Sequence, residues 1–176
     1  MKKIFIFLVA VLLVSKYKVY ATSWKVCQSC LVQTIQFALS QASAYDTIFI
    51  EKGIYKEGNL SITKPIILIG IDYPVLDGEF KHEIISIKAD SVEINGLLIQ
   101  NSGIATLDDP GGIKVYERKH ILITNNQLLN NFFGIYIQYS KNCEIRNNRI
   151  SATGTEEQSI GNGIHCWKSD SLKIIA

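Results

Sequence analysis

The stretch "GIKVYERKHILITNNQLLNN", residues 112–131, is followed by a second copy of its pattern, "GIYIQYSKNCEIRNNRISAT", residues 134–153. When Gly112 is placed on Gly134, the apolar residues of the copies coincide, and the asparagine pair at 125–126 falls on the pair at 147–148. Apolar and polar residues alternate over short segments of each copy, which is typical of β-strands. Asparagine and glycine tolerate the left-handed backbone of tight corners, so each copy predicts strands separated by turns.

Further copies extend the repeat in both directions. The shift that places Gly134 on Gly163 aligns the second copy with residues 163–174, and the same shift carries the first copy back to residues 94–99. Such a unit cannot bury its apolar face alone, so units must stack. We therefore predict an all-β single-stranded parallel β-helix rather than a leucine-rich repeat, which needs leucines at fixed spacing. Earlier strands are expected at 47–50, 59–62, 65–70 and 83–88.

The two ends of the repeat differ from its middle. The segment "CLVQTIQFALSQAS", residues 30–43, predicts a short amphipathic helix that caps the first coil. Its apolar stripe consists of Leu31, Ile35, Ala38, Leu39 and Ala42. The sequence stops at Ala176, part way through a unit, so we expect the β-helix domain to be truncated at its C-terminus.

The first residues predict a signal peptide, residues 1–21. Lys2 and Lys3 precede an apolar run, 4–14, and the small residues Val19 and Ala21 suit a cleavage site. An uncleaved anchor is the alternative. Cleavage would leave the β-helix domain, residues 22–176, exported to the periplasm and not integral to the membrane. It would also remove 4 of the 18 basic residues, leaving 14 against 16 acidic ones, so nothing suggests a nucleic-acid partner.

Cys27 and Cys30 form the motif "CQSC" near the expected mature N-terminus. This spacing is compatible with a metal or redox site, and more readily with a local disulfide or a tether for the first turn, which an exported protein can form. A haem attachment motif would continue with histidine, whereas Leu31 stands there. The sequence leaves both alternatives open.

Several segments together resemble the N-terminal part of the NosD family, from about Leu31 to Ala176. They are "TIQFALSQASAYDTIFIEKGIYKEGNLSITKPIILIG" (34–70), "LDGE" (76–79), "VEINGLLIQNSG" (92–103), "GIYIQYSKNCEIRNNRI" (134–150) and "GNGIHCWKS" (161–169). The resemblance implies a right-handed, periplasmic β-helix protein without enzymatic activity. It implies an ABC-type ATPase and permease, a copper chaperone and nitrous oxide reductase as partners, in assembly of a copper–sulfide centre.

Copper is the cofactor that this resemblance implies. Met1 is the only methionine and lies in the expected signal, so no methionine-rich copper site is expected in the rest of the chain. No copper ligand is carried over from the family by position.

Two loops that precede Gly-Ile strands carry acidic pairs. Asp108 and Asp109 lie in residues 101–112, and Glu156 and Glu157 lie in residues 151–162, two coils further on. Because coils stack about 4.8 Å apart, both loops should leave one edge of the solenoid, an arrangement that suits a partner or cation site. Two solvated loops are the simpler interpretation. Clustered carboxylates also suit the alternative function, a carbohydrate-binding or polysaccharide-cleaving β-helix.

The outward side chains of the repeat form two columns. One holds Tyr116, Gln138 and Trp167, and the other holds Lys114, Tyr136 and His165. Such an aromatic ladder suits stacking on a sugar or a partner protein, although cross-strand packing alone would also explain it. In "GNGIHCWKS" the alternation directs His165 and Trp167 outward and Cys166 into the core, so His165 and Cys166 should not chelate one metal ion together.

Overall fold

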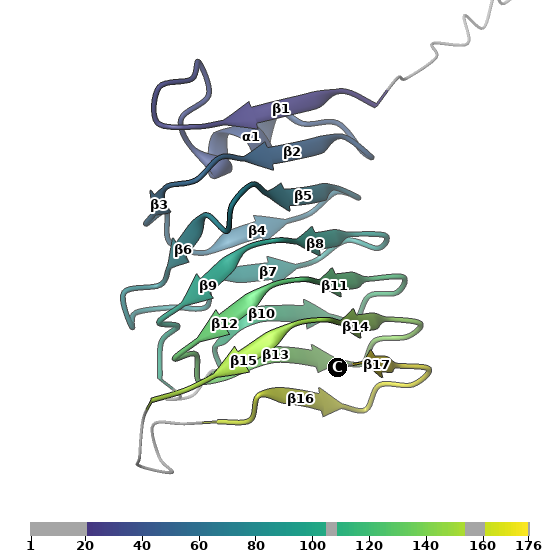
Figure 1. Cartoon of the computed structure of the whole chain (residues 1–176). Coiled ribbons are helices and arrows are strands. Elements are labelled where there is room, and N and C mark those ends of the chain that lie inside the picture. The colour runs from purple at the N-terminus through teal and green to yellow at the C-terminus, as the bar shows by residue number, and fades with distance from the viewer. Residues whose placement is uncertain (1–20, 105–108, 154–160, 176) are drawn as a thin grey trace, which may run out of the picture.

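The computed structural model describes residues 21–104, 109–153 and 161–175, and these form a right-handed parallel β-helix with one short helix (Figure 1). Three parallel sheets run along the stack. Sheet A contains β1 (Ser23–Val26), β2 (Thr47–Ile50), β5 (Ile67–Gly70), β8 (Glu93–Asn95), β11 (Leu122–Thr124), β14 (Glu144–Arg146) and β17 (Lys173–Ile175). Sheet B contains β3 (Ile54–Tyr55), β6 (Val75–Asp77), β9 (Leu98–Gln100), β12 (Gln127–Leu129) and β15 (Arg149–Ser151). Sheet C contains β4 (Leu60–Ile62), β7 (Ile85–Ile87), β10 (Gly111–Tyr116), β13 (Phe133–Gln138) and β16 (Ile164–Trp167).

The chain visits the three sheets in the order A, B, C and then returns to A one coil further along. The register confirms both alignments of the repeat: Ile123 pairs with Ile145 on one side and with Ile94 on the other. Ile145 in turn pairs with Ile174. The fold class predicted from the repeat is therefore confirmed.

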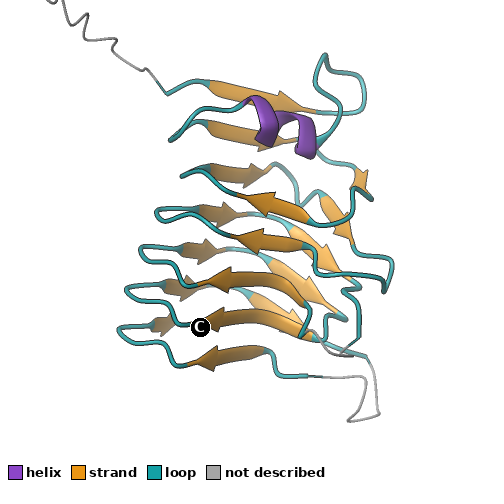
Figure 2. Ribbon diagram, turned by 180° about the vertical axis from the view of Figure 1, so that it is seen from behind, coloured by secondary structure: helices purple, strands orange, loops and turns teal. Residues whose placement is uncertain are grey.

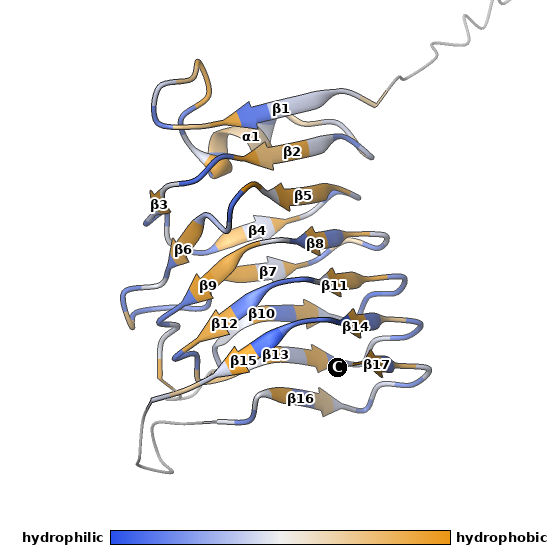
Figure 3. Cartoon of the chain, in the orientation of Figure 1, coloured by the Kyte–Doolittle hydropathy of each residue, from blue (hydrophilic) through white to orange (hydrophobic). Residues whose placement is uncertain are grey.

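The core is a set of stacked aliphatic columns, one from each sheet. In sheet C the pairs Ile85/Ile87, Ile113/Val115 and Ile135/Ile137 lie directly over one another and are fully buried. Hydrophobic residues accordingly concentrate in the strands, while the turns between them are mostly hydrophilic (Figure 3). Burial of β-branched side chains in each coil against the next supplies the main stabilisation of the stack.

The corner between sheets A and B shows why asparagine recurs. Gly96, Asn125 and Asn147 occupy equivalent corner positions with φ of 74°, 55° and 54°. The next residue, Asn126, is buried; its Oδ1 accepts from the Leu97 N–H at 3.0 Å, and its Nδ2 donates to the Ile94 carbonyl at 3.0 Å. Its side chain therefore ties its own corner to the preceding coil, where strand pairing is interrupted.

The N-terminal cap contains α1 (Ile35–Gln41), which lies beside the first coil and contacts β1, β2 and β4 (Figure 2). Thr34 caps it through its side chain, which accepts from the Phe37 N–H at 3.2 Å. Ile35 and Ala38 are buried as predicted. Leu31 is a correction: the helix begins only at Ile35, so Leu31 lies in the preceding turn and is fully exposed.

Asp46 joins β1 to this cap. Its carboxylate accepts hydrogen bonds from the N–H of Thr22 (2.7 Å), the N–H of Ser43 (2.8 Å) and the indole of Trp24 (3.0 Å). Burial alone would raise the pKa of Asp46, but these bonds to the ionised form outweigh it and hold the pKa at about 2.

None of the helices in the described ranges is long and apolar enough to cross a membrane.

Replacement of Asn126 by alanine should destabilise the fold by about 2 kcal/mol, because it leaves the Leu97 N–H unpaired in the interior and removes the side-chain hydrogen bond to the Ile94 carbonyl. Urea denaturation of residues 22–176 measures this. Asn125→Gly is the matched control, since glycine accepts the positive φ of that exposed corner. Equal stability of the two variants would contradict the role assigned to Asn126.

Candidate functional site

The outward face of sheet C carries the aromatic and basic side chains of the repeat. Register places Lys114, Tyr136 and His165 side by side on β10, β13 and β16, and it places Tyr116, Gln138 and Trp167 in the neighbouring column. Both predicted columns are confirmed. We call this surface the ladder face, and its residues are Lys88, Lys114, Tyr116, Tyr136, Gln138, His165 and Trp167.

The middle of the ladder face is built around Lys114. Its Nζ lies 5.1 Å from the ring centroid of Tyr116 and 4.7 Å from that of Tyr136, and it donates to the Asp109 carbonyl at 3.0 Å. Lys114 and Tyr136 are both buried. Cation–π contacts of this kind contribute up to about 2 kcal/mol when desolvated, so this part of the face is rigid.

The end of the ladder face is aromatic and more open. The His165 ring contacts Tyr136 edge-on at 4.8 Å between centroids and stacks with Trp167 at 6.5 Å with an interplanar angle of 13°. Phe133 packs against His165 at 4.8 Å. Trp167 is 48% exposed, and the Lys168 Nζ lies over its ring, 5.9 Å from the centroid. An exposed tryptophan on a rigid support is a common anchor for a sugar ring or a partner protein.

A groove lies over β7 and β10, beside the middle of the ladder face. Its volume is about 520 Å³, and we call it the Glu83 groove. Side chains of the strands line one part of the groove, and the connections from sheet B to sheet C line another part. Two of these connections are joined by a hydrogen bond, in which the Gly103 N–H donates to the His82 carbonyl at 2.9 Å. The lining residues are Asn59, Lys81, His82, Glu83, Ser86, Lys88, Gly103, Ile104, Pro110, Lys114, Tyr116 and Gln138.

Glu83 is anchored in this groove by two hydroxyl donors. Ser86 donates to one carboxylate oxygen, and the Tyr116 hydroxyl donates to the other at 2.9 Å. Burial raises the pKa of Glu83, and the hydroxyls together with Lys114 and Lys88 only partly offset this rise. The groove therefore holds a fixed carboxyl group that is protonated more readily than an exposed glutamate.

Glu83, Ser86 and Lys88 were not among the predicted site residues, although all three lie within 83–88, where a strand was expected. A shift that places Ile85 on Ile113 would have revealed Ser86 and Lys88, because the two isoleucines pair and Ser86 pairs with Lys114. Ser86 and Lys88 then extend the two outward columns by one coil. Glu83 lies before the strand, in a connection that breaks the repeat, so no periodic signal marks it.

The predicted acidic loops both connect sheet B to sheet C, as expected from the repeat. Asp109 is exposed, and its carbonyl accepts from Lys114. Asp108, Glu156 and Glu157 lie outside the described residues, so the proposed pairing of the two loops stays a prediction.

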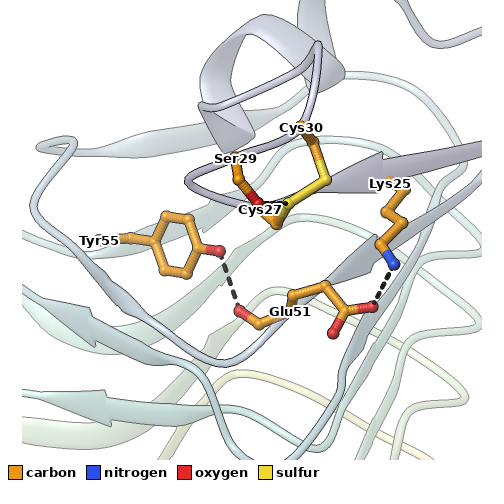
Figure 4. Close-up of a disulfide and its surroundings, with 6 residues drawn as sticks. All are labelled: Lys25, Cys27, Ser29, Cys30, Glu51 and Tyr55. Carbon is orange, nitrogen blue, oxygen red and sulfur yellow. Dashed lines mark hydrogen bonds and ion pairs between the residues drawn. A yellow bond between two sulfur atoms is a disulfide. The ribbon is translucent and has the colours of Figure 1, made fainter.

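Cys27 and Cys30 form a disulfide, with 2.07 Å between the sulfurs and 5.1 Å between the Cα atoms (Figure 4). Nearby, Lys25 pairs with Glu51 at 3.0 Å, and the Tyr55 hydroxyl donates to the Glu51 carbonyl at 2.9 Å. The disulfide form offers no thiolates to a metal, so the metal-site hypothesis applies to the reduced pair. Within the described residues, histidine, cysteine, aspartate and glutamate side chains form no group of three that could hold a metal ion.

Cys166 is a second correction. Its backbone pairs with Ile137 in the inward column, as the alternation predicted, but its side chain is exposed rather than buried. Sheet C ends at β16 in the described part of the chain, so no further coil covers it. Cys143, just before β14, is buried.

Comparison with models of protein families supports the fold. A family model described as a right handed beta helix region matches residues 76–176, more than half of the chain. No curated protein matches the sequence. A solved structure of a pectin methylesterase in complex with a hexasaccharide is similar, with 14% identity and a TM-score of 0.46; the match covers 88% of this chain and 67% of that one.

Replacement of Glu83 by glutamine should stabilise the fold relative to the wild type, and this stabilisation should increase as the pH rises. Because folding raises the pKa of Glu83, its contribution to stability is full below the unfolded-state pKa and is lost as the pH rises through the folded-state pKa. The variant cannot ionise. The difference in the free energy of unfolding between variant and wild type should therefore grow from pH 4 to pH 7.

Urea denaturation at both pH values measures this difference, and Glu117→Gln controls for the loss of a surface charge. A difference that shrinks as the pH rises would show that the ionised form of Glu83 is the one that the groove favours.

Proposed function

The chain belongs to the right-handed β-helix family, and from that premise we propose that it is a non-enzymatic, exported accessory protein that acts by binding. The observation that carries the proposal is the His165–Trp167 end of the ladder face. It offers an exposed tryptophan stacked on a ring that is itself packed against Tyr136 and Phe133. Little side-chain entropy remains to be lost there when a partner binds.

The resemblance to the NosD family gives this binding role a context. We propose that the protein works in the periplasm with an ABC-type ATPase and permease and with a copper chaperone. Its client would be nitrous oxide reductase, whose copper–sulfide centre is being assembled. The segment "GNGIHCWKS" that carries part of the resemblance is also the segment that supplies His165 and Trp167.

Copper enters the proposal as cargo rather than as a resident cofactor. Once an external dithiol has reduced the disulfide between Cys27 and Cys30 by thiol–disulfide exchange, the two freed thiols offer Cu(I) soft ligands, which suit this ion. The surrounding described residues complete no larger ligand group, so a partner would supply the remaining ligands.

A carbohydrate-binding β-helix is the second candidate, favoured by the Glu83 groove beside the ladder face. Binding fits better than cleavage. Glycoside hydrolysis uses two carboxyl groups flanking the scissile bond, whereas Glu83, held by two hydroxyl donors, is the one carboxyl group among the described residues that line this groove.

Trp167→Ala tests the accessory role. In a denitrifying cell that lacks its own NosD-like protein, the wild-type chain should restore copper–sulfide centre formation, measured as nitrous oxide reductase activity and copper content. The variant should restore it at least tenfold less, since a buried tryptophan anchor contributes about 2 kcal/mol or more to binding.

Phe37→Ala is the matched control, because Phe37 is 50% exposed on α1, which contacts β4 at the other end of sheet C from β16. Restoration by Trp167→Ala equal to that by Phe37→Ala would refute the role of the ladder face. Failure of the exported, folded wild-type chain to restore the centre would refute the assembly function.

A further inference from the structure

The disulfide between Cys27 and Cys30 lies at the surface, in the turn that joins β1 to α1 (Figure 4). Both cysteines are half-buried, and the two residues between them are exposed. The next residue, Leu31, is fully exposed. Exposed disulfides are the ones that exchange readily with thiols, because a reagent reaches them without any opening of the core.

Backbone contacts hold this turn without help from the disulfide. Val26 and Val32 form a parallel bridge across the turn, and the Cys27 N–H donates to the Val32 carbonyl at 3.2 Å. The Cys30 N–H donates to the Cys27 carbonyl at 3.2 Å. The disulfide spans a sequence separation of only 3, and short loops gain least from a cross-link. Reduction should therefore leave the turn folded, as reversible exchange requires.

The helix that follows the turn is anchored separately at both ends. At its start, the Glu57 carboxylate accepts from the N–H of Ile35 at 2.9 Å and from the N–H of Gln36 at 2.8 Å. At its end, the Lys64 Nζ donates to the Ala42 carbonyl at 2.6 Å. Neither anchor involves residues 27–31, so α1 should stay docked when the disulfide is open.

The two sulfurs have different surroundings. The Ser29 hydroxyl lies 3.5 Å from the Cys27 sulfur, which carries no proton in the disulfide, so the hydroxyl is the donor. The same hydroxyl would donate to the thiolate that Cys27 becomes when the bond breaks. A stabilised thiolate leaves more readily, so an incoming thiolate should attack Cys30. Leu31, directly after Cys30, then offers an incoming protein an apolar contact beside the attacked sulfur.

We propose that the Cys27–Cys30 disulfide is an exchange site for a protein dithiol that docks against Leu31. The first thiolate of that protein bonds to the Cys30 sulfur, and the disulfide breaks with its electron pair on Cys27, which takes up a proton. The second thiol of the partner loses its proton and displaces Cys30 from the mixed disulfide, and Cys30 is protonated in turn. The chain gains two electrons and two protons, and the partner is left with a disulfide.

This inference deepens the proposed accessory role, because the copper step of that role rests on reduction of this disulfide. Exchange itself needs no metal, so the site is tested without copper.

The test compares reduction of residues 22–176 by thioredoxin, a protein dithiol, and by dithiothreitol, a small one, at equal concentrations. Alkylation of the freed thiols, followed by mass spectrometry of the peptide that carries Cys27 and Cys30, measures the rates. Thioredoxin should act about tenfold faster or more, since docking orients its thiolate. Leu31→Ser should cost about tenfold with thioredoxin and nothing with dithiothreitol, because only the protein loses an apolar contact.

Phe80→Ser is the matched control, since Phe80 is an exposed apolar residue in the connection between β6 and β7. It should be reduced as the wild type is by both reagents. Circular dichroism of the reduced wild type should match that of the oxidised chain.

A thioredoxin variant that keeps only its attacking cysteine locates the attacked sulfur. Rapid alkylation of the mixed disulfide should label Cys27 and leave thioredoxin on Cys30. Thioredoxin on Cys27 instead would overturn the order of attack.

Three results would overturn the exchange site: equal rates with thioredoxin and dithiothreitol, no loss of thioredoxin rate in a folded Leu31→Ser variant, or reduction only after urea has unfolded the chain. A chain that passes these tests yet fails to restore the copper–sulfide centre would keep the exchange site and refute the accessory role. Restoration of the centre by a chain that thioredoxin does not reduce would refute the exchange site alone.

Discussion

In-register parallel pairing between coils is the interaction on which the rest of this structure depends. No coil can bury its aliphatic residues alone, and each strand obtains its backbone partners from the coils before and after it. Pairing of Ile123 with both Ile94 and Ile145 fixes the register in sheet A. Because side chains alternate across a strand, that register also fixes what faces outward, so the ladder face is a direct consequence of the stacking.

The connections between sheets B and C vary along the solenoid, and this variation creates the site. Between β12 and β13 the chain turns within residues 130–132, which leaves Tyr136 and His165 to pack against Phe133. Earlier in the chain, longer connections lie beside the strand face and line the Glu83 groove. One scaffold thus carries a polar groove and an aromatic end a few coils apart.

The repetitive parts of the molecule were predictable, and the parts that break the repeat were not. Apolar alternation and asparagine corners were sufficient to place Lys114, Tyr136 and His165 in one column, because these features recur from coil to coil. Glu83 lies in an irregular connection, and its importance depends on Ser86, close by in the chain, and on Tyr116, which belongs to the next coil. Leu31 and Cys166 were misjudged because burial depends on neighbouring elements, which sequence periodicity does not describe.

The stacking register is tested most directly by paired cysteines in a Cys143→Ser, Cys166→Ser background. Glu144 and Lys173 are partners across β14 and β17, although they belong to successive coils and are distant in the chain. Introduced cysteines at these two positions should form a disulfide on mild oxidation, because directly paired residues bring their Cβ atoms within about 5.5 Å. Cysteines at Glu144 and Ile175, which are out of register, should remain free. Efficient cross-linking of the second pair, or none of the first, would contradict the coil stacking on which the ladder face and the groove depend.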